Sequence, residues 1–155
     1  MKPTKTVELF LIKNSNGRTE ATRNRRIIDV GEFPDEIGAY VIRYRTHKVP
    51  RFFGFSEILK IGNTVDSFKN RFRNYNHQCD LTVAGSDLYE ALKTRSQKTN
   101  IRLMYFLAHT NHPSPIDVEF YYASPSSQPT EMEYELIRTY MTQHGELPPL
   151  NFGMK

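Results

Sequence analysis

The chain has 155 residues, enough for one domain with its own core. Apolar residues make up 38% and charged residues 25%, and ten Phe and nine Tyr residues indicate that aromatic side chains supply much of the packing. The single cysteine, Cys79, excludes an internal disulfide and a cysteine-built metal site. No window approaches the ~18 apolar residues of a membrane span, and no signal peptide is evident, so we expect a soluble, cytoplasmic protein.

The net charge of +4 is distributed unevenly along the chain. Residues 1–80 hold 15 basic and 9 acidic side chains, whereas residues 112–155 hold 2 basic and 6 acidic ones. A basic N-terminal part and an acidic C-terminal part suit a protein that binds a polyanion with one face. A solvated surface with ordinary scatter explains the same asymmetry equally well.

Residues 1–35 are predicted to form an N-terminal β-hairpin. Residues 7–12 are a short apolar run, and Asn16-Gly17 is a dipeptide preferred in tight hairpin turns. The returning strand is basic, with Arg25 and Arg26 as candidate phosphate contacts beside Arg18 and Arg23. A solvated edge strand, where charge discourages aggregation, is the alternative.

Two strands and a basic helix follow. Residues 37–44 and 57–61 are apolar runs of strand length, and Gly62-Asn63-Thr64 leads into a helical pattern over 65–75. The residues spaced for one apolar helix face are Val65, Phe68, Phe72 and Tyr75. Lys69, Arg71 and Arg73 lie off that face and can reach outward.

An insertion at 45–56 separates the two strands and is both basic and aromatic. It contains Pro50, Gly54 and three phenylalanines at 52, 53 and 55. Such a mixture can stack on nucleic-acid bases. Half-buried packing is the commoner use of such side chains, and we expect the three phenylalanines to belong to the core.

The second half of the chain alternates helix and strand patterns. We predict a helix over 86–97, the third strand of the sheet over 100–109, and a fourth, returning strand over 116–123. The last helix is predicted to begin at Thr130 as N-cap, with Glu133 three residues later as in a capping box, and to end at Gly145.

Two roles compete for Glu133. As the capping-box carboxylate it would fold back onto the Thr130 amide, and spacing alone favours this structural role. Leu136, Ile137 and Tyr140 follow at i+3, i+4 and i+7, so the carboxylate also falls on the inward face of the helix. A carboxylate there needs a cation or a hydrogen-bond network to offset its desolvation.

Four elements in order resemble the GIY-YIG nuclease family. They are Gly38-Ala39-Tyr40, then Lys60-Ile61-Gly62, then Arg71 in a basic helix, and finally Glu133-x-x-Leu136-Ile137-Arg138 with Pro148-Pro149-Leu150-Asn151. The match covers roughly 37–76 and 130–151. Ala39 and Lys60 stand where the family has Ile and Tyr, and the triplets lie about twice as far apart as is usual. The resemblance implies an α+β fold with a small three-stranded antiparallel sheet flanked by helices. Residues 1–155 would form a single domain, with 36–151 as its core.

The resemblance also implies roles for individual residues. Tyr40 matches the general base or orienter of the attacking water, and Arg71 matches the arginine that clamps the scissile phosphate. Glu133 matches the ligand of a single divalent metal, for which Mg²⁺ is expected and Mn²⁺ is possible. Asn151 matches an asparagine that orients substrate or holds the loop near the site. Lys60, in the position of the second tyrosine, can contact the phosphate or favour ionisation of the neighbouring phenol.

These matches predict a metal-dependent endonuclease acting on DNA, with RNA not excluded, as a monomer or homodimer. The substrate-binding candidates are Asn151, Arg73, Lys69, Tyr75, His77, Arg25 and Arg26. Tyr75 stands where some family members carry a histidine, but it also fits the apolar helix face. The alternative is a catalytically inactive nucleic-acid-binding module with the same fold. A protein-interaction domain without a nucleic-acid partner is a third, weaker possibility.

Overall fold

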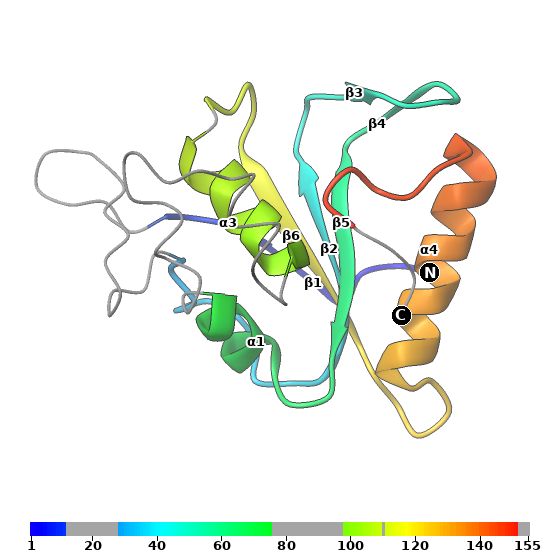
Figure 1. Cartoon of the computed structure of the whole chain (residues 1–155). Helices are drawn as coiled ribbons and strands as arrows, with labels where there is room; N and C mark the ends of the chain where they lie inside the picture. The colour runs from blue at the N-terminus through cyan, green and yellow to red at the C-terminus, as the bar shows by residue number, and fades with distance from the viewer. Residues whose placement is uncertain (12–27, 76–97, 110, 152–155) are drawn as a thin grey trace, which may run out of the picture.

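The computed structural model describes residues 1–11, 28–75, 98–109 and 111–151, which form an α+β fold (Figure 1). An antiparallel sheet of four strands has the order β1-β6-β2-β5. A two-stranded sheet, β3-β4, stands apart from it. The strands of the large sheet are β1 (Lys5–Glu8), β2 (Gly38–Tyr44), β5 (Ile58–Thr64) and β6 (Ile116–Tyr122), and those of the small one are β3 (Val49–Pro50) and β4 (Phe55–Ser56). The described helices are α1 (Phe68–Tyr75), α3 (Lys98–His109) and α4 (Pro129–His144).

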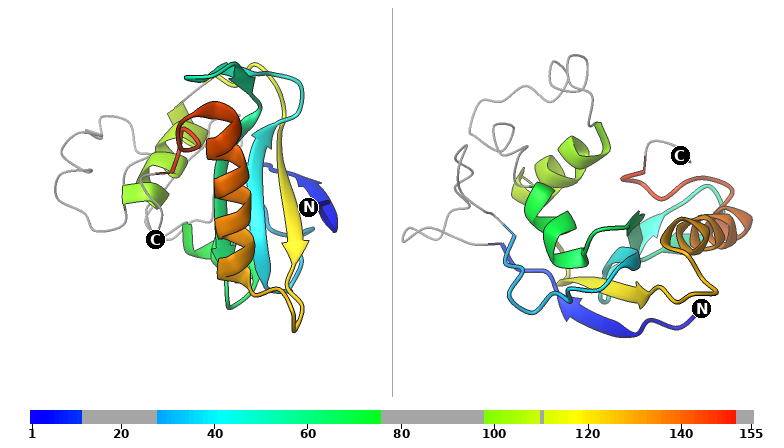
Figure 2. Two further views of the ribbon diagram at one scale, coloured as in Figure 1. Left: turned by 90° about the vertical axis from the view of Figure 1, so that its right-hand side faces the viewer. Right: turned by 90° about the horizontal axis from the view of Figure 1, so that it is seen from below.

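Helices cover both faces of the large sheet. In Figure 2, α4 runs along one face, and α1 and α3 lie on the other. The sequence explains this arrangement through β2, whose side chains are apolar on both sides. Tyr40 and Ile42 pack in the core cluster with α1 and α3, whereas Ala39 and Val41 pack with α4.

The two glycines of the matched triplets meet specific steric demands. Gly38 has φ +153, and a Cβ there would collide with the backbone carbonyl of Tyr121 on β6. Gly62 lies opposite Tyr40 in the β2–β5 register, and a Cβ on it would collide with the Tyr40 ring and hydroxyl. Glycine at 62 therefore makes the space in which the Tyr40 phenol lies.

The prediction of a strand over 100–109 is wrong, because this segment is helix α3. A short apolar run does not distinguish a buried strand from a buried helix by periodicity alone. The buried side chains are Leu103, Met104 and Leu107, spaced at i, i+1 and i+4, which is the pattern of a helix face. Its apolar side packs against the sheet instead of extending it.

The large sheet is built from a different set of strands than the one predicted. The strand at 116–122 was expected, but it lies inside the sheet, paired with both β1 and β2. The N-terminal strand pairs with β6, whereas the predicted hairpin partner contributes one described bridge, Leu11 with Ile28. The predicted turn at 14–17 and the helix over 86–97 lie outside the described residues.

The insertion forms the β3–β4 hairpin, and its phenylalanines are not core. Phe52, Phe53 and Phe55 are 76, 57 and 65% exposed, which overturns the prediction of half-buried packing. The hairpin projects beyond the sheet beside the C-terminal end of α4 (Figure 1). These rings therefore lie away from the core that the large sheet forms with its helices.

The starts of two helices also differ from prediction. Helix α1 begins at Phe68, after Ser67, whose hydroxyl accepts the N–H of Asn70 at 3.1 Å; Val65 is exposed. Helix α4 begins at Pro129, so Thr130 is not the N-cap. Glu131 instead accepts the N–H of Gln128 at 3.3 Å. The predicted end at Gly145 is confirmed, with φ 74 in the left-handed region.

Among the described residues, no helix is both long enough and apolar enough to span a membrane.

Candidate functional site

The candidate residues gather on the two faces of β5, the edge strand of the large sheet. Gly62 faces the Tyr40 phenol, on the side of α1. The next residue, Asn63, points its side chain to the opposite face, where it meets Glu133 of α4. Two groups of polar side chains thus lie on opposite faces of β5, one beside Gly62 and the other at Asn63.

Tyr40, Tyr75 and Arg71 form the first group. The Tyr40 and Tyr75 hydroxyls share a short hydrogen bond, and both side chains are 0% exposed. The Arg71 guanidinium carbon lies 5.1 Å from the centre of the Tyr75 ring, a cation–π geometry. Phe72 packs between the two tyrosines, with its ring 5.0 Å from Tyr40 and 5.3 Å from Tyr75. The apolar face predicted for α1 thus also carries the polar contact to Tyr40.

Burial and mutual contact set the charge states of this group. Burial raises the pKa of Tyr75 well above 10.0, and the neighbouring Tyr40 adds to the rise although Arg71 opposes it. Burial lowers the pKa of Arg71, but the interactions with Tyr40 and Tyr75 together raise it by more. At neutral pH the group therefore holds a protonated Tyr75 beside a cationic Arg71.

Lys60 lies on the same face of β5 as this group. Side chains alternate along a strand, and Ile61 belongs to the core on the α4 side. Lys60 therefore points to the face of Tyr40, one pleat away from Gly62. Lys60 is 3% exposed, so the position that the resemblance pairs with the second tyrosine holds a buried lysine.

Glu133 and Asn63 form the second group. The Asn63 side-chain amide donates a short hydrogen bond to the Glu133 carboxylate. Glu131 is the carboxylate that folds back on the start of α4, so the capping role considered for Glu133 is wrong. The helical spacing of Glu133 with Ile137 and Tyr140, both buried, explains why its side chain turns toward the sheet.

Asn151 fastens the C-terminal segment to β5. Its side chain accepts the N–H of Ile61 at 3.0 Å and donates to the Ile61 carbonyl at 2.9 Å. Leu150 N–H also donates to the Leu59 carbonyl at 2.9 Å. Of the two roles that the resemblance implies for Asn151, holding the loop near the site is the one its contacts serve.

The described contacts of the other basic candidates are with residues outside the Tyr40–Tyr75 pair. Lys69 forms an ion pair with Asp35 at 3.3 Å, and Arg73 donates to the Asn70 side chain at 3.3 Å. The Arg73 Nε atom is buried without a hydrogen-bond partner. His77, Arg25 and Arg26 lie outside the described residues.

The side chains around Glu133 suit one kind of metal ion and not another. Within the described ranges, no three His, Cys, Asp or Glu side chains cluster, so Glu133 stands as a single carboxylate beside the Asn63 amide. Mg²⁺ commonly uses one or two carboxylates and completes its shell with water and substrate oxygens. The residues present fit such an ion, and they do not fit a structural zinc site.

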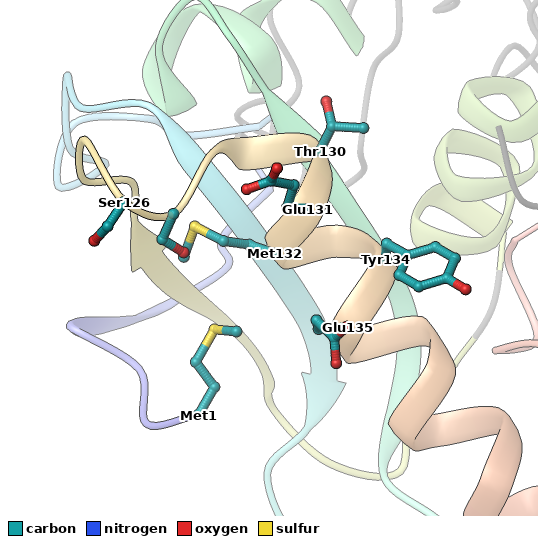
Figure 3. Close-up of a pocket in the computed structure, with 8 residues that line it drawn as sticks. Met1, Ser126, Thr130, Glu131, Met132, Tyr134 and Glu135 are labelled. Carbon is teal, nitrogen blue, oxygen red and sulfur yellow. The ribbon is translucent and has the colours of Figure 1, made fainter.

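A hollow of about 570 Å³ lies elsewhere, between the N-terminal methionine and the first turns of α4. Figure 3 shows Glu131, Met132 and Glu135 on its α4 side and Met1 across from them. No Lys, Arg or His is among its lining residues. Since carboxylates without a cation repel an anion, this hollow does not suit an anionic ligand.

Sequence reasoning missed Asn63 as a member of the site. Its signal was available: it follows the second triplet directly and lies two residues after Ile61, so strand alternation puts both on the α4 face. A polar side chain on a face that a helix covers requires a partner. Only the packing of α4 identifies that partner as Glu133.

The chain matches no protein-family model, no curated protein and no solved structure.

Proposed function

We propose that this chain is a metal-dependent endonuclease that hydrolyses phosphodiester bonds in DNA. The resemblance of its sequence elements to the GIY-YIG nucleases motivates the proposal. One observation carries it: Gly62 and Asn63, adjacent in edge strand β5, hold the Tyr40–Tyr75–Arg71 group on one face and Glu133 on the other. A phosphodiester lying along this edge would meet a guanidinium from one side and a carboxylate from the other.

Among the described residues, the contacts at the β5 edge leave Asn63, beyond Ile61, as the position for such a ligand. The C-terminal segment covers the edge at Leu59 and Ile61. In an antiparallel pair, backbone groups that point away from the neighbouring strand recur at every second residue, so the N–H of Asn63 points outward like that of Ile61. It is placed to donate to a phosphate oxygen between the two groups.

In the reaction, water attacks the phosphorus, the bond to the leaving oxygen breaks, and the proton of the water must be accepted. Tyr75 keeps its proton because burial raises its pKa, so it donates a hydrogen bond to the Tyr40 oxygen, and the Tyr40 hydroxyl orients the attacking water, whose proton passes to solvent. Arg71 offsets the charge that develops on the phosphate. Tyr40 has no exposed surface in the free chain, so this role requires that substrate binding uncovers it.

When bound, a divalent ion supplies charge neutralisation at the leaving oxygen. Glu133 is the residue that would hold it, with Asn63 fixing the orientation of the carboxylate.

The test is cleavage of supercoiled and linear DNA with Mg²⁺ or Mn²⁺, with and without EDTA. Glu133→Gln and Arg71→Gln should each reduce the rate about 100-fold or more, while Glu133→Gln still binds DNA. Glu135→Gln is the matched control, because Glu135 lies on the same helix with an exposed side chain paired to Arg138 at 3.8 Å. Cleavage that survives Glu133→Gln would assign the metal role to another carboxylate.

A specific observation favours a second candidate, a catalytically inactive nucleic-acid-binding module. Tyr40 and Lys60 are both buried in the free chain. If wild type binds DNA with strong salt dependence but cuts neither substrate with either metal, this candidate replaces the endonuclease.

A further inference from the structure

The β3–β4 hairpin carries an unusual concentration of exposed aromatic surface. Phe52, Phe53 and Phe55 are 76, 57 and 65% exposed, and they surround Gly54, the positive-φ residue of the hairpin turn. Single exposed apolar residues are common, whereas three large ones within four positions form a patch of the size that often serves binding. We call Phe52, Phe53 and Phe55 the phenylalanine cluster.

The hairpin is fastened to the end of α4, so the cluster is presented on a fixed backbone. Phe53 N–H donates to the His144 carbonyl at 3.0 Å, and Phe52 N–H donates to the Glu146 carboxylate at 2.7 Å. Arg51 pairs with Glu146 at 2.9 Å and donates to the Leu147 carbonyl at 2.9 Å. A hairpin held at these points needs little further ordering when a ligand binds.

The three rings differ in what they contribute to the fold. The Phe53 ring lies so close to Gly145 that a Cβ there would touch it, and it meets the Phe52 ring edge-on at 5.1 Å. Phe53 thus packs against the end of α4. Phe52 and Phe55 are the two most exposed, and they are the rings that a ligand can cover.

The exposed area argues against a second copy of the chain as the occupant. A phenylalanine buries about 150–250 Å² when fully covered, so three rings at these exposures offer roughly 400 Å². A stable protein interface needs about 800 Å² from each partner. The cluster is too small for a stable dimer and large enough for one or two nucleobases.

The chemistry of the cluster fits stacking without sequence readout. Phenylalanine rings have no polar atoms, so they stack on any base. The nearby cations are already paired, Lys48 with Glu57 at 3.5 Å and Arg51 with Glu146, so the hairpin adds stacking surface and few phosphate contacts. The chain continues from β4 directly into β5, which carries Lys60 and Asn63.

We propose that Phe52 and Phe55 stack on unpaired bases of the nucleic acid, so that the preferred substrate contains a single-stranded region. The inference rests on the proposed function and specifies its substrate class. Phe55 and Asn63 are eight residues apart, at most ~26 Å of extended strand, a span on the order of eight stacked nucleotides. The single-stranded region is therefore held within that distance of the cleavage site.

The test is equilibrium binding of a labelled 20-nucleotide single strand and of the matching duplex, in EDTA so that no cleavage occurs. Replacing both Phe52 and Phe55 by Ala should weaken single-strand binding about tenfold or more, because stacking contributes ~1–3 kcal/mol per base. Duplex binding should not change. The slope of log K against log salt should also stay constant, because no phosphate contact is lost.

Two further variants separate stacking from simple apolar contact. The double replacement by Leu retains apolar surface without a ring and should lose as much single-strand affinity as the Ala variant. The double replacement by Tyr should retain it. Phe10→Ala is the control, since Phe10 is 57% exposed elsewhere on the surface. Circular dichroism verifies that each variant is folded.

Each contrary result has its own meaning. Unchanged single-strand binding by the Ala variant overturns the inference and leaves the endonuclease proposal standing. Full affinity in the Leu variant rejects stacking. A wild-type dimer in sedimentation that the Ala variant breaks would identify a second copy as the occupant. Wild type that binds neither strand nor duplex removes the proposed function itself.

Discussion

The side-chain amide of Asn63 donates a hydrogen bond to the carboxylate of Glu133 across 70 residues of sequence. It joins edge strand β5 to α4 at the position immediately after the second matched triplet. Because the amide is a donor to an ionised group, this hydrogen bond is of the stronger, charge-assisted kind. It fixes where the Glu133 carboxylate points.

Changing Asn63 to Asp should turn this attraction into repulsion between two carboxylates. At neutral pH and without divalent ions we expect a loss of ~1–3 kcal/mol in the free energy of unfolding, because the donor is replaced by a like charge. Mg²⁺ should restore most of the loss if the pair binds the ion. Urea unfolding with and without Mg²⁺ measures both effects, with Asn63→Ala as the neutral control. Equal stability of the Asp and Ala variants would show that the Glu133 carboxylate is not held at Asn63.

Tyr75→Phe should preserve the fold but disturb Tyr40. The ring that packs on Phe72 remains, while the Tyr40 hydroxyl loses its partner in a buried site. We expect a stability loss of ~1–3 kcal/mol and, if the chain is a nuclease, a drop in cleavage rate of about 10- to 100-fold. Tyr134→Phe, at an exposed tyrosine, should change neither quantity. An unchanged rate in Tyr75→Phe would remove Tyr75 from any positioning role.

Stability should fall in alkaline solution because of Tyr75. Burial raises the pKa of Tyr75 in the folded chain above its unfolded value near 10.0, so above that pH the unfolded state releases a proton that the folded state retains. The stability is therefore complete below pH ~10 and declines above it, by about 1.4 kcal/mol per pH unit from this residue. Urea unfolding between pH 8 and 12 measures the slope, which should be shallower in Tyr75→Phe. A Tyr75→Phe slope equal to that of wild type would contradict the assignment.

Asn151→Ala should loosen the C-terminal segment from β5. The substitution removes two hydrogen bonds to the Ile61 backbone in a buried setting, so we expect a loss of ~1–3 kcal/mol. Asn151→Asp should be less stable than Asn151→Ala at pH 7 and more stable at pH 3. At pH 7 the Asp carboxylate would face the Ile61 carbonyl without a proton to donate, whereas at pH 3 the protonated carboxyl can donate to it. Asn74→Ala, at an exposed position of α1, is the control. If the free energy of unfolding of Asn151→Asp, relative to Asn151→Ala, is the same at pH 3 and pH 7, this contact is not formed.

Patterns that depend on neighbouring residues were predictable from the sequence. The strands at 38–44 and 116–122, the basic helix with Phe68, Phe72 and Tyr75 inward, and the end of the last helix at Gly145 all follow from local periodicity and backbone preference. The segment at 100–109 was mispredicted because a short, strongly apolar run satisfies strand and helix patterns alike. The phenylalanines at 52, 53 and 55 were mispredicted because composition does not reveal whether a core lies within reach.

The sequence by itself determined the matched triplets, the position of Arg71 on the basic helix and the inward spacing of Glu133 in the last helix. The tertiary structure alone decided that Tyr75 meets Tyr40, that Asn63 meets Glu133 and that Asn151 closes on Ile61. These contacts join residues 35 to 90 positions apart. Periodicity specifies which face a side chain occupies, but its partner depends on how strands and helices pack, which arises from the whole chain.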